Sequence, residues 1–161
     1  MARPGTTLLN EERPFGIEEL FFSTTTPSGI IRAGNRVFAR VSGWSSNELI
    51  GQPHNILRHP DMPRGVFRLM WETLGKGEEI FAYVKNMSKN GDHYWVFAHV
   101  TPSFDANDNI IGYHSNRRKP APVQIEKVQP IYAALLAEER KHRNGKEGLE
   151  ASFAMLQDAV R

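Results

Sequence analysis

The hydrophobic positions near the start of the chain follow the pattern of a β-hairpin. Residues 19–26 are rich in aromatic and β-branched side chains, which favour extended backbone, and residues 27–29 (Pro-Ser-Gly) are turn formers. Ile30 and Ile31 then begin a second hydrophobic run. The pattern predicts two short antiparallel strands joined by a tight turn.

Helical periodicity replaces the strand pattern after this hairpin. Apolar side chains recur at helical spacing in residues 35–42, and Gly43 is suited to end a short helix there. A capping pattern of serines and Glu48 predicts a second short helix that ends near Gly51. A longer amphipathic stripe follows. It consists of Val66, Phe67, Met70, Trp71 and Leu74.

The helix that carries this stripe has start and stop signals in the sequence. Pro63 suits a first helical position, and Asp61 is placed to cap the helix with its carboxylate. Gly75 and Gly77 indicate where the helix ends, because glycine readily adopts the backbone of a helix terminus. We therefore predict a helix that begins close to Pro63.

Three strand-like runs come next, at residues 79–87, 93–102 and 109–117. The turn residues Lys89–Asp92 and Asp105–Asn109 separate them, so they are predicted to form an antiparallel meander. The order of two strands, several helices and three strands predicts an α+β fold. Helices should cover one face of the sheet and leave a pocket between helices and sheet, where we expect the functional site.

The chain divides into three segments by composition. Residues 1–16 contain two prolines and two glycines and are expected to be a flexible arm or an N-terminal cap; residues 17–119 form the ordered domain. Residues 120–161 are a C-terminal extension with two amphipathic helices, at 125–143 and 147–160. The apolar stripe of the first helix can pack on the sheet, form a homodimer contact or begin a connector to a downstream module. This stripe contains Val128, Ile131, Tyr132, Leu135 and Leu136.

Composition excludes several classes of function. The 161 residues contain no cysteine, which rules out disulfides, thiolate metal sites and thiol nucleophiles. Twenty Lys and Arg against 18 Asp and Glu, mostly scattered, give no basic face for nucleic acid. No apolar run approaches the ~18 residues of a membrane span, so we expect a cytoplasmic protein without direct membrane insertion. Glycine-rich phosphate loops and nucleophile elbows are absent, so an enzyme is not predicted.

Polar side chains gather just before the main helix, at His54, Asn55, Arg58, His59 and Asp61. The start of a helix attracts anions through its free N–H groups and its dipole, so a pyrophosphate would suit this region. The alternative is structural: Asp61 caps the helix, Arg58 pairs with a carboxylate, and the histidines face water. A metal site is less favoured, because prolines leave no regular face for both histidines.

Asn86 and several aromatic residues are further candidates. The amide of Asn86 can donate and accept hydrogen bonds, which suits the edge of a flavin or purine ring, although it also lies near the end of a strand. The aromatic side chains can stack on a planar ring or simply form the core. They are Phe67, Trp71, Tyr83, Tyr94 and Trp95.

Three motifs within residues 19–117 resemble one known family. The runs GWSSNELIGQPHNILRHPDMP, MWETLGKGE and VKNMSKNGDHYWV are similar to the PAS domain of bacterial aerotaxis receptors, which bind FAD and report cellular redox state. The resemblance implies a five-stranded antiparallel sheet in the order 2-1-5-4-3, with helices on one face and the ligand between them. It implies an FAD site formed by Asn35, His54, Asn55, Arg58, His59, Asp61, Phe67, Trp71, Asn86 and Tyr94.

The resemblance also implies a mode of action. FAD would be held non-covalently, and its redox state would be relayed to a signalling partner or downstream transducer domain, with Asn86 reorienting when the flavin is reduced. Two alternatives keep the fold: a haem domain with His59, His93 or His99 as the axial ligand, and a cofactor-free interaction module. Without cysteine, the cysteinyl–flavin photochemistry of blue-light PAS domains is impossible.

Overall fold

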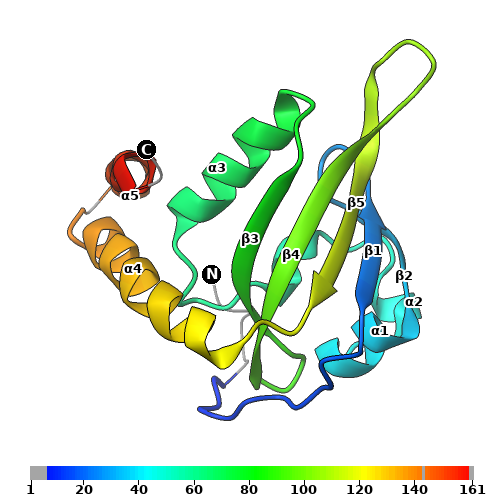
Figure 1. The fold of residues 1–161 in the computed structure, drawn as a ribbon, viewed down its shortest axis with the longest axis horizontal. Helices are drawn as coiled ribbons and strands as arrows, with labels where there is room; N and C mark the ends of the chain where they lie inside the picture. Colours follow the sequence, from blue (N-terminus) through cyan, green and yellow to red (C-terminus); the bar gives the residue numbers. More distant parts are fainter. Residues whose placement is uncertain (1–6, 143, 160–161) are drawn as a thin grey trace.

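A five-stranded antiparallel sheet in the order β2-β1-β5-β4-β3 forms the centre of the computed structural model, which describes residues 7–142 and 144–159 (Figure 1). The class and strand order agree with the prediction, and the meander is confirmed. Residues 1–6 of the predicted arm and the helix ends predicted at Arg143 and Val160 lie outside the described residues. The strands are β1 Phe21–Thr25, β2 Ile31–Gly34, β3 Ile80–Met87, β4 His93–Phe104 and β5 Ile110–Arg118.

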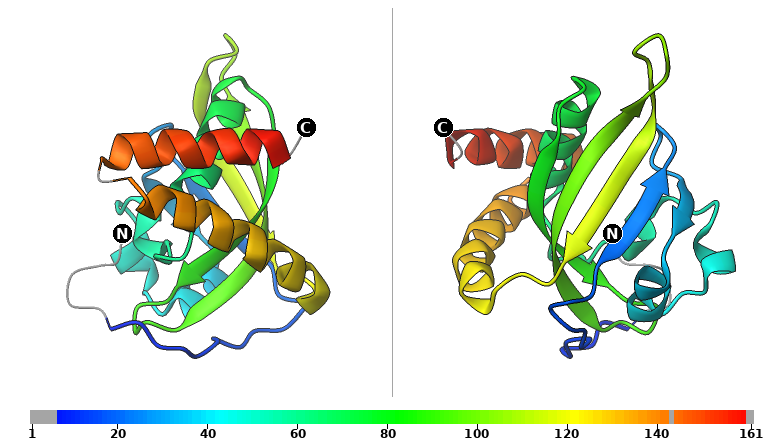
Figure 2. Two further views of the ribbon diagram at one scale, coloured as in Figure 1. Left: turned by 90° about the vertical axis from the view of Figure 1, so that its left-hand side faces the viewer. Right: turned by 45° about the vertical axis from the view of Figure 1, so that its right-hand side comes forward.

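Short helices between β2 and β3 cover one face of the sheet (Figure 2). Asn35 caps the first of them by accepting a hydrogen bond from the backbone N–H of Phe38, and Gly43 ends it in the left-handed conformation. Ser45 caps the second helix in the same way. These segments are α1 Arg36–Ser42, α2 Ser46–Leu49, the 3-10 helix η1 His54–Leu57 and α3 Arg64–Gly75.

The core lies between this helical layer and the inner face of the sheet. Alternate side chains of each strand face inward, as strand geometry requires, and Phe21 and Tyr94 are fully buried there. Phe15, from the segment before β1, packs edge-on against both rings. The N-terminal segment is also tied to β4, because the backbone N–H of Arg13 donates to the carbonyl of His93 at 2.7 Å.

The start of α3 differs from the prediction. Asp61 does not cap the helix, because α3 begins at Arg64, and the carboxylate of Asp61 instead pairs with Lys85 Nζ at 3.0 Å. The N–H groups of Arg64 and Gly65 donate to the carboxylate of Glu139, at 2.6 and 3.3 Å. Pro63 holds an extended backbone before the helix, so the acceptor comes from a distant part of the chain.

The C-terminal helices α4 Pro122–Arg140 and α5 Gly145–Ala159 pack in two different places. Tyr132 of α4 stacks on Trp95 of the outer sheet face, and its hydroxyl donates to the carbonyl of Tyr83 at 2.7 Å. Leu135 is buried, whereas Ile131 remains 48% exposed, so the predicted stripe is covered only in part. Helix α5 lies against α3. No helix of the described residues is long and apolar enough to cross a membrane.

Candidate functional site

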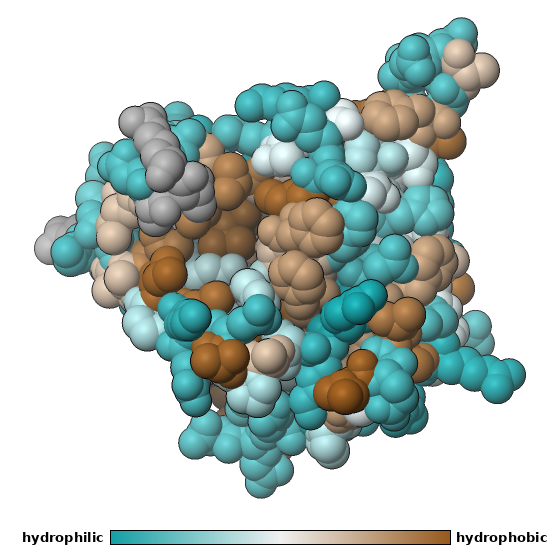
Figure 3. All heavy atoms as spheres, in the orientation of Figure 1, coloured by the Kyte–Doolittle hydropathy of each residue, from teal (hydrophilic) through white to brown (hydrophobic). Residues whose placement is uncertain are grey.

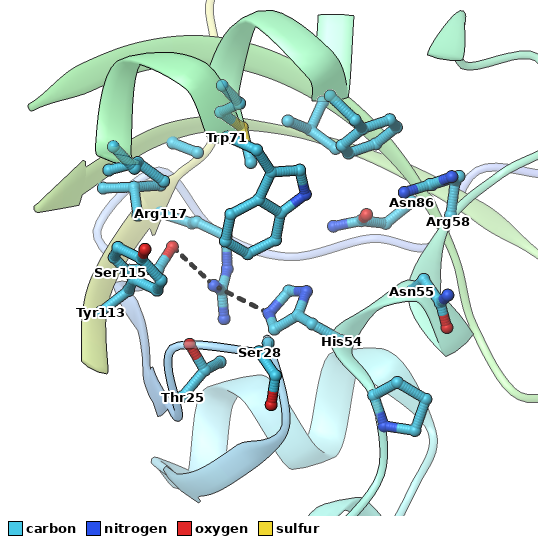
Figure 4. Close-up of a pocket in the computed structure, with 18 residues that line it drawn as sticks. Thr25, Ser28, His54, Asn55, Arg58, Trp71, Asn86, Tyr113, Ser115 and Arg117 are labelled. Carbon is cyan, nitrogen blue, oxygen red and sulfur yellow. Dashed lines mark hydrogen bonds between the residues drawn. The ribbon is translucent and has the colours of Figure 1, made fainter. Parts of the chain in front are cut away.

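A cavity of about 230 Å³ lies between α3, η1 and the inner face of the sheet (Figure 4). Its volume is slightly below the ~300–1,000 Å³ typical of small-molecule sites. Helix α3 provides one apolar wall through Phe67, Met70, Trp71 and Leu74, and inward-facing strand residues provide the other. Its polar lining consists of Thr25, Ser28, His54, Asn55, Arg58, Asn86, Ser115 and Arg117.

Arg117 is a buried cation on the inner face of β5 and is only 3% exposed. Its Nη1 donates to Ser23 Oγ at 2.9 Å and to Ser115 Oγ at 2.7 Å. Its Nε and Nη2 have no hydrogen-bond partner within the described part of the chain. Burial lowers the pKa of Arg117 to about 10, so the guanidinium stays protonated at neutral pH. Among the described residues, no Asp or Glu lines the cavity to balance this charge.

His54 accepts a hydrogen bond from this arginine. The distance from Arg117 Nη1 to His54 Nε2 is 3.4 Å, and the imidazole stacks on the ring of Phe38 at 5.9 Å between centroids. Burial, assisted by the neighbouring positive charge of Arg117, lowers the pKa of His54 to about 3. The imidazole is therefore neutral at pH 7 and can serve as the acceptor.

Arg58 supplies a second cation at the opposite side of Trp71 from Ser115 and Tyr113 (Figure 4). Its guanidinium lies 3.9 Å above the centre of the Phe67 ring, and its Nε has no hydrogen-bond partner among the described residues. Burial lowers the pKa of Arg58 from its usual value, with a smaller contribution from the charge of Arg64. A positive charge thus lies on each side of the cavity.

Asn86 and Trp71 complete the lining. Asn86 is 4% exposed, lines the cavity and pairs with Arg58 in an isolated β-bridge. Trp71 contacts Tyr113 edge-on at 5.5 Å and is 40% exposed. Gly29 has a φ of 85°, and a Cβ atom there would lie 3.5 Å from the indole, so the turn and the helix approach closely.

Six of the ten residues predicted for the site line the cavity, and four do not. The six are His54, Asn55, Arg58, Phe67, Trp71 and Asn86. Asn35 lies outside because it is a helix cap: its oxygen accepts from the N–H groups of Phe22 and Phe38, and its amide donates to the carbonyl of Leu20. Its polar atoms are therefore used within the fold.

His59, Asp61 and Tyr94 also lie away from the cavity. His59 is buried and accepts a hydrogen bond from the backbone N–H of Asp61 at 3.0 Å. Burial, together with the charge of Lys85, lowers its pKa to about 4. Tyr94 is on the inner sheet face but packs against Phe21 in the core. Each of the three side chains belongs to the scaffold around the cavity.

The axial histidines of the haem alternative are not in the cavity either. His59 faces His93, and His99 pairs with Glu79 at 2.9 Å. No group of three or more His, Asp or Glu side chains that could hold a metal ion occurs in residues 7–142 and 144–159. The three histidines named for the haem alternative therefore do not line this cavity.

Arg117 is the charged lining residue that the sequence prediction missed. It lies in a run of three basic residues at 117–119, which resembles a solvated surface cluster. Strand alternation could have identified it, because Tyr113, Ser115 and Arg117 follow one another on the inner face of β5.

Comparisons with known proteins support the fold and identify the family. A family model described as PAS fold matches residues 32–117. The chain is 44% identical over 127 residues to the aerotaxis receptor of Escherichia coli, which covers 79% of this chain and 25% of the receptor. It is 23% identical over 132 residues to the biofilm dispersion protein BdlA of Pseudomonas aeruginosa, which covers 81% of this chain and 29% of that protein. The chain thus spans between a quarter and a third of the length of these relatives.

Solved structures show the same fold. A light-oxygen-voltage domain studied with a flavin analogue superposes with a TM-score of 0.62 at 19% identity, and covers 77% of this chain and 90% of its own. The dark structure of the blue-light photoreceptor Aureochrome1 LOV gives a TM-score of 0.57 at 24% identity, with coverage of 74% and 83%.

Proposed function

Because this chain belongs to the PAS family of sensory domains, we propose that it binds FAD non-covalently in the cavity and relays the flavin redox state to a signalling partner. The relative with 44% identity is named an aerotaxis receptor, which supports a role in the response to oxygen or energy state. We place the domain in the cytoplasm, and we assign it a signalling rather than an enzymatic role.

The observation that carries this proposal is the pair of unpartnered donors on Arg117. A buried N–H group without an acceptor is costly, so such a group in a cavity points to a ligand that supplies the acceptor. The carbonyl and nitrogen edge of a flavin ring offers acceptors, and the apolar walls of α3 and the sheet suit its planar faces. Arg58 and Asn55 lie across the cavity from Arg117 and can bind the phosphate groups of the ligand (Figure 4).

The chain's own residues fit a ligand that gains negative charge. When bound, a flavin supplies reversible electron transfer. Arg117 remains protonated and would stabilise negative charge on the ligand, while His54 stays neutral and holds the guanidinium by accepting its hydrogen bond. Asn86 can exchange its donor and acceptor by rotating its amide, which would alter contacts at the end of β3.

The outer face of the sheet offers a contact surface for a partner or a downstream module. Hydrophobic side chains gather over β3 and β4 on this face (Figure 3). Phe81 is 54% exposed and stacks on Phe97 and His99, at 5.8 and 4.2 Å between ring centroids. An exposed aromatic cluster of this kind is typical of interaction sites.

The proposal is tested by the visible spectrum of the purified chain before and after anaerobic reduction with dithionite. We expect the flavin absorption band with fluorescence, bleaching on reduction and recovery in air. A sharp Soret band would instead identify haem. A colourless protein whose melting temperature is unchanged by added FAD would reduce the chain to an unliganded interaction module.

A further inference from the structure

The C-terminal extension holds the helix that forms one wall of the cavity. Glu139 of α4 accepts hydrogen bonds from the N–H groups of Arg64 and Gly65, which open α3. Pro63, the residue at the helix cap, accepts no hydrogen bond from these N–H groups through its side chain. A helix start favours an anion, and here the chain's own carboxylate occupies that position. We call the contact between Glu139 and the first turn of α3 the latch.

Helix α5 reinforces the latch along the outer side of α3. A Cβ atom on Gly65 would lie 2.6 Å from Ser152 Oγ and 3.0 Å from the backbone N of Phe153. The two helices are therefore so close at this point that only glycine fits without a shift of α3 or α5. Arg68 pairs with Glu150 at 3.0 Å. The guanidinium of Arg68 also lies 4.2 Å above the ring of Phe153. The side of α3 that carries Gly65 and Arg68 is therefore packed against α5.

Helices α4 and α5 are themselves closely packed. A Cβ atom on Gly148 would lie 2.6 Å from the carbonyl oxygen of Glu139, so α5 begins directly against the end of α4. The side chain of Arg64 donates to the carbonyl of Gly145 at 2.9 Å, which links the start of α3 to the start of α5. Figure 2 shows α4 and α5 stacked beside α3. The extension thus contacts α3 as one unit.

The opposite side of α3 faces the cavity through Phe67, Met70, Trp71 and Leu74. One helix therefore has the ligand space on one side and the extension on the other. When the extension is docked on α3, the helix moves less. A ligand that binds on the other side then loses less conformational entropy, so docking and ligand binding favour each other. By linkage, the ligand must strengthen the docking of the extension by the same factor by which docking strengthens ligand binding.

We propose that Glu139 latches α4 and α5 to the cavity wall, so that cavity occupancy controls how tightly the extension is docked. The ligand-dependent part rests on the proposed binding of FAD. The signal then leaves the domain through α3 and the extension. The proposal identifies Glu139 as a positioning residue that never touches the ligand.

The test compares Glu139→Ala with Glu138→Ala in the full chain. Glu138 is a matched control, because it is the neighbouring residue of the same helix and, within residues 7–142 and 144–159, its carboxylate bonds to Lys141 and His142 of its own segment. Hydrogen exchange of residues 122–159 and of the Arg64 and Gly65 amides measures docking. Fluorescence titration with FAD measures affinity. We expect Glu139→Ala to speed exchange and to weaken FAD binding at least about 5-fold, the lower end of typical allosteric coupling.

Each result bears on the proposal. Faster exchange together with weaker FAD binding in Glu139→Ala, and neither change in Glu138→Ala, supports it. Equal behaviour of the two variants overturns the latch, and faster exchange with unchanged FAD affinity overturns the coupling. If the unaltered chain binds no FAD, the proposed function fails, and exchange of the ligand-free variants still decides the latch. Should Glu139→Ala not fold, Glu139→Gln keeps an acceptor oxygen, removes the charge and is expected to give a smaller change in the same direction.

Discussion

The cavity and the first turn of α3 both attract negative charge, and the chain satisfies only one of them. Glu139 accepts the N–H groups of Arg64 and Gly65 at the helix start. In the cavity, Nε and Nη2 of Arg117 have no acceptor among the described residues. Helix-start N–H groups and buried guanidinium N–H groups are both unfavourable in a folded protein when they lack an acceptor. The helix start is thus satisfied within the fold, and the open donors of Arg117 are the basis of our proposal that a ligand binds in the cavity.

Removal of the charge of Arg117 is the strongest test of this difference between the cavity and the helix start. Arg117→Met should weaken FAD binding roughly 10- to 100-fold, because a hydrogen bond to a charged group contributes about 1.5–3 kcal/mol. The ligand-free variant should nevertheless melt no lower than the unaltered chain, since a buried cation without a counter-ion opposes folding. Titration and thermal melting measure the two effects.

Arg118→Met is the control for this variant, because Arg118 follows directly and is exposed. It should leave both FAD affinity and melting temperature unchanged. Equal FAD affinity in the two variants would show that Arg117 does not meet the ligand. A large loss of stability in ligand-free Arg117→Met would show that it serves the scaffold instead.

Glycine substitutions in α3 test the packing at the start of this helix, where the chain supplies its own acceptor. Gly65→Ala should destabilise the chain by about 1–3 kcal/mol, because its Cβ would collide with the backbone of α5. Gly75→Ala, at the other end of the same helix, meets no atom within 4 Å and should stabilise it by up to ~1 kcal/mol. Urea denaturation measures both. Equal stabilities would mean that α5 does not dock closely on α3.

Acid titration tests the electrostatics of the cavity around Arg117 and His54. The pKa of His54 is lowered from 6.5 to about 3 in the folded chain, so the unfolded chain binds a proton that the folded chain does not. The stability contributed by His54 is complete above pH 6.5 and declines as the pH falls toward 3. His54→Gln should make the loss of stability between pH 6.5 and 4 less steep in thermal melts. An unchanged slope in His54→Gln relative to the unaltered chain would contradict the assignment.

The smallest effect is expected at the contact between α4 and the sheet. Tyr132→Phe removes the hydrogen bond to the carbonyl of Tyr83 and keeps the ring on Trp95. The loss should be about 0.5–1.5 kcal/mol in urea denaturation. No change at all would indicate that this end of α4 is not held on the sheet and that the latch at Glu139 carries the docking.

Elements with a strong period were predictable from the sequence, because burial repeats at fixed spacing. The stripe of α3 predicted the helix, whereas the family resemblance assigned Phe67 and Trp71 to the ligand site, and both residues line the cavity. The contact of Glu139 with Arg64 was not predictable, since 75 residues separate them and helix packing alone brings them together. The sequence offered Asp61 as a nearer carboxylate, but Lys85 pairs with it across the fold.

Site residues were predictable only where the motif and the geometry coincide. Asn86 faces the cavity because the pleat of β3 turns it inward, and its place in the motif agrees. Asn35 and Tyr94 belong to the same family pattern, yet a cap and a core position use them. Arg117 lies in a basic run that resembles a surface cluster, and its alternation with Ser115 along β5 and its pairing with Phe21 place it on the inner face of the sheet.

Identification of the ligand extracted from the purified chain is the most direct test of the central claim. Denaturation of the native protein followed by mass spectrometry of the released compound should yield FAD, at up to one molecule per chain, and FAD added to stripped protein should restore it. No flavin in the extract, together with no uptake of added FAD, would contradict the account.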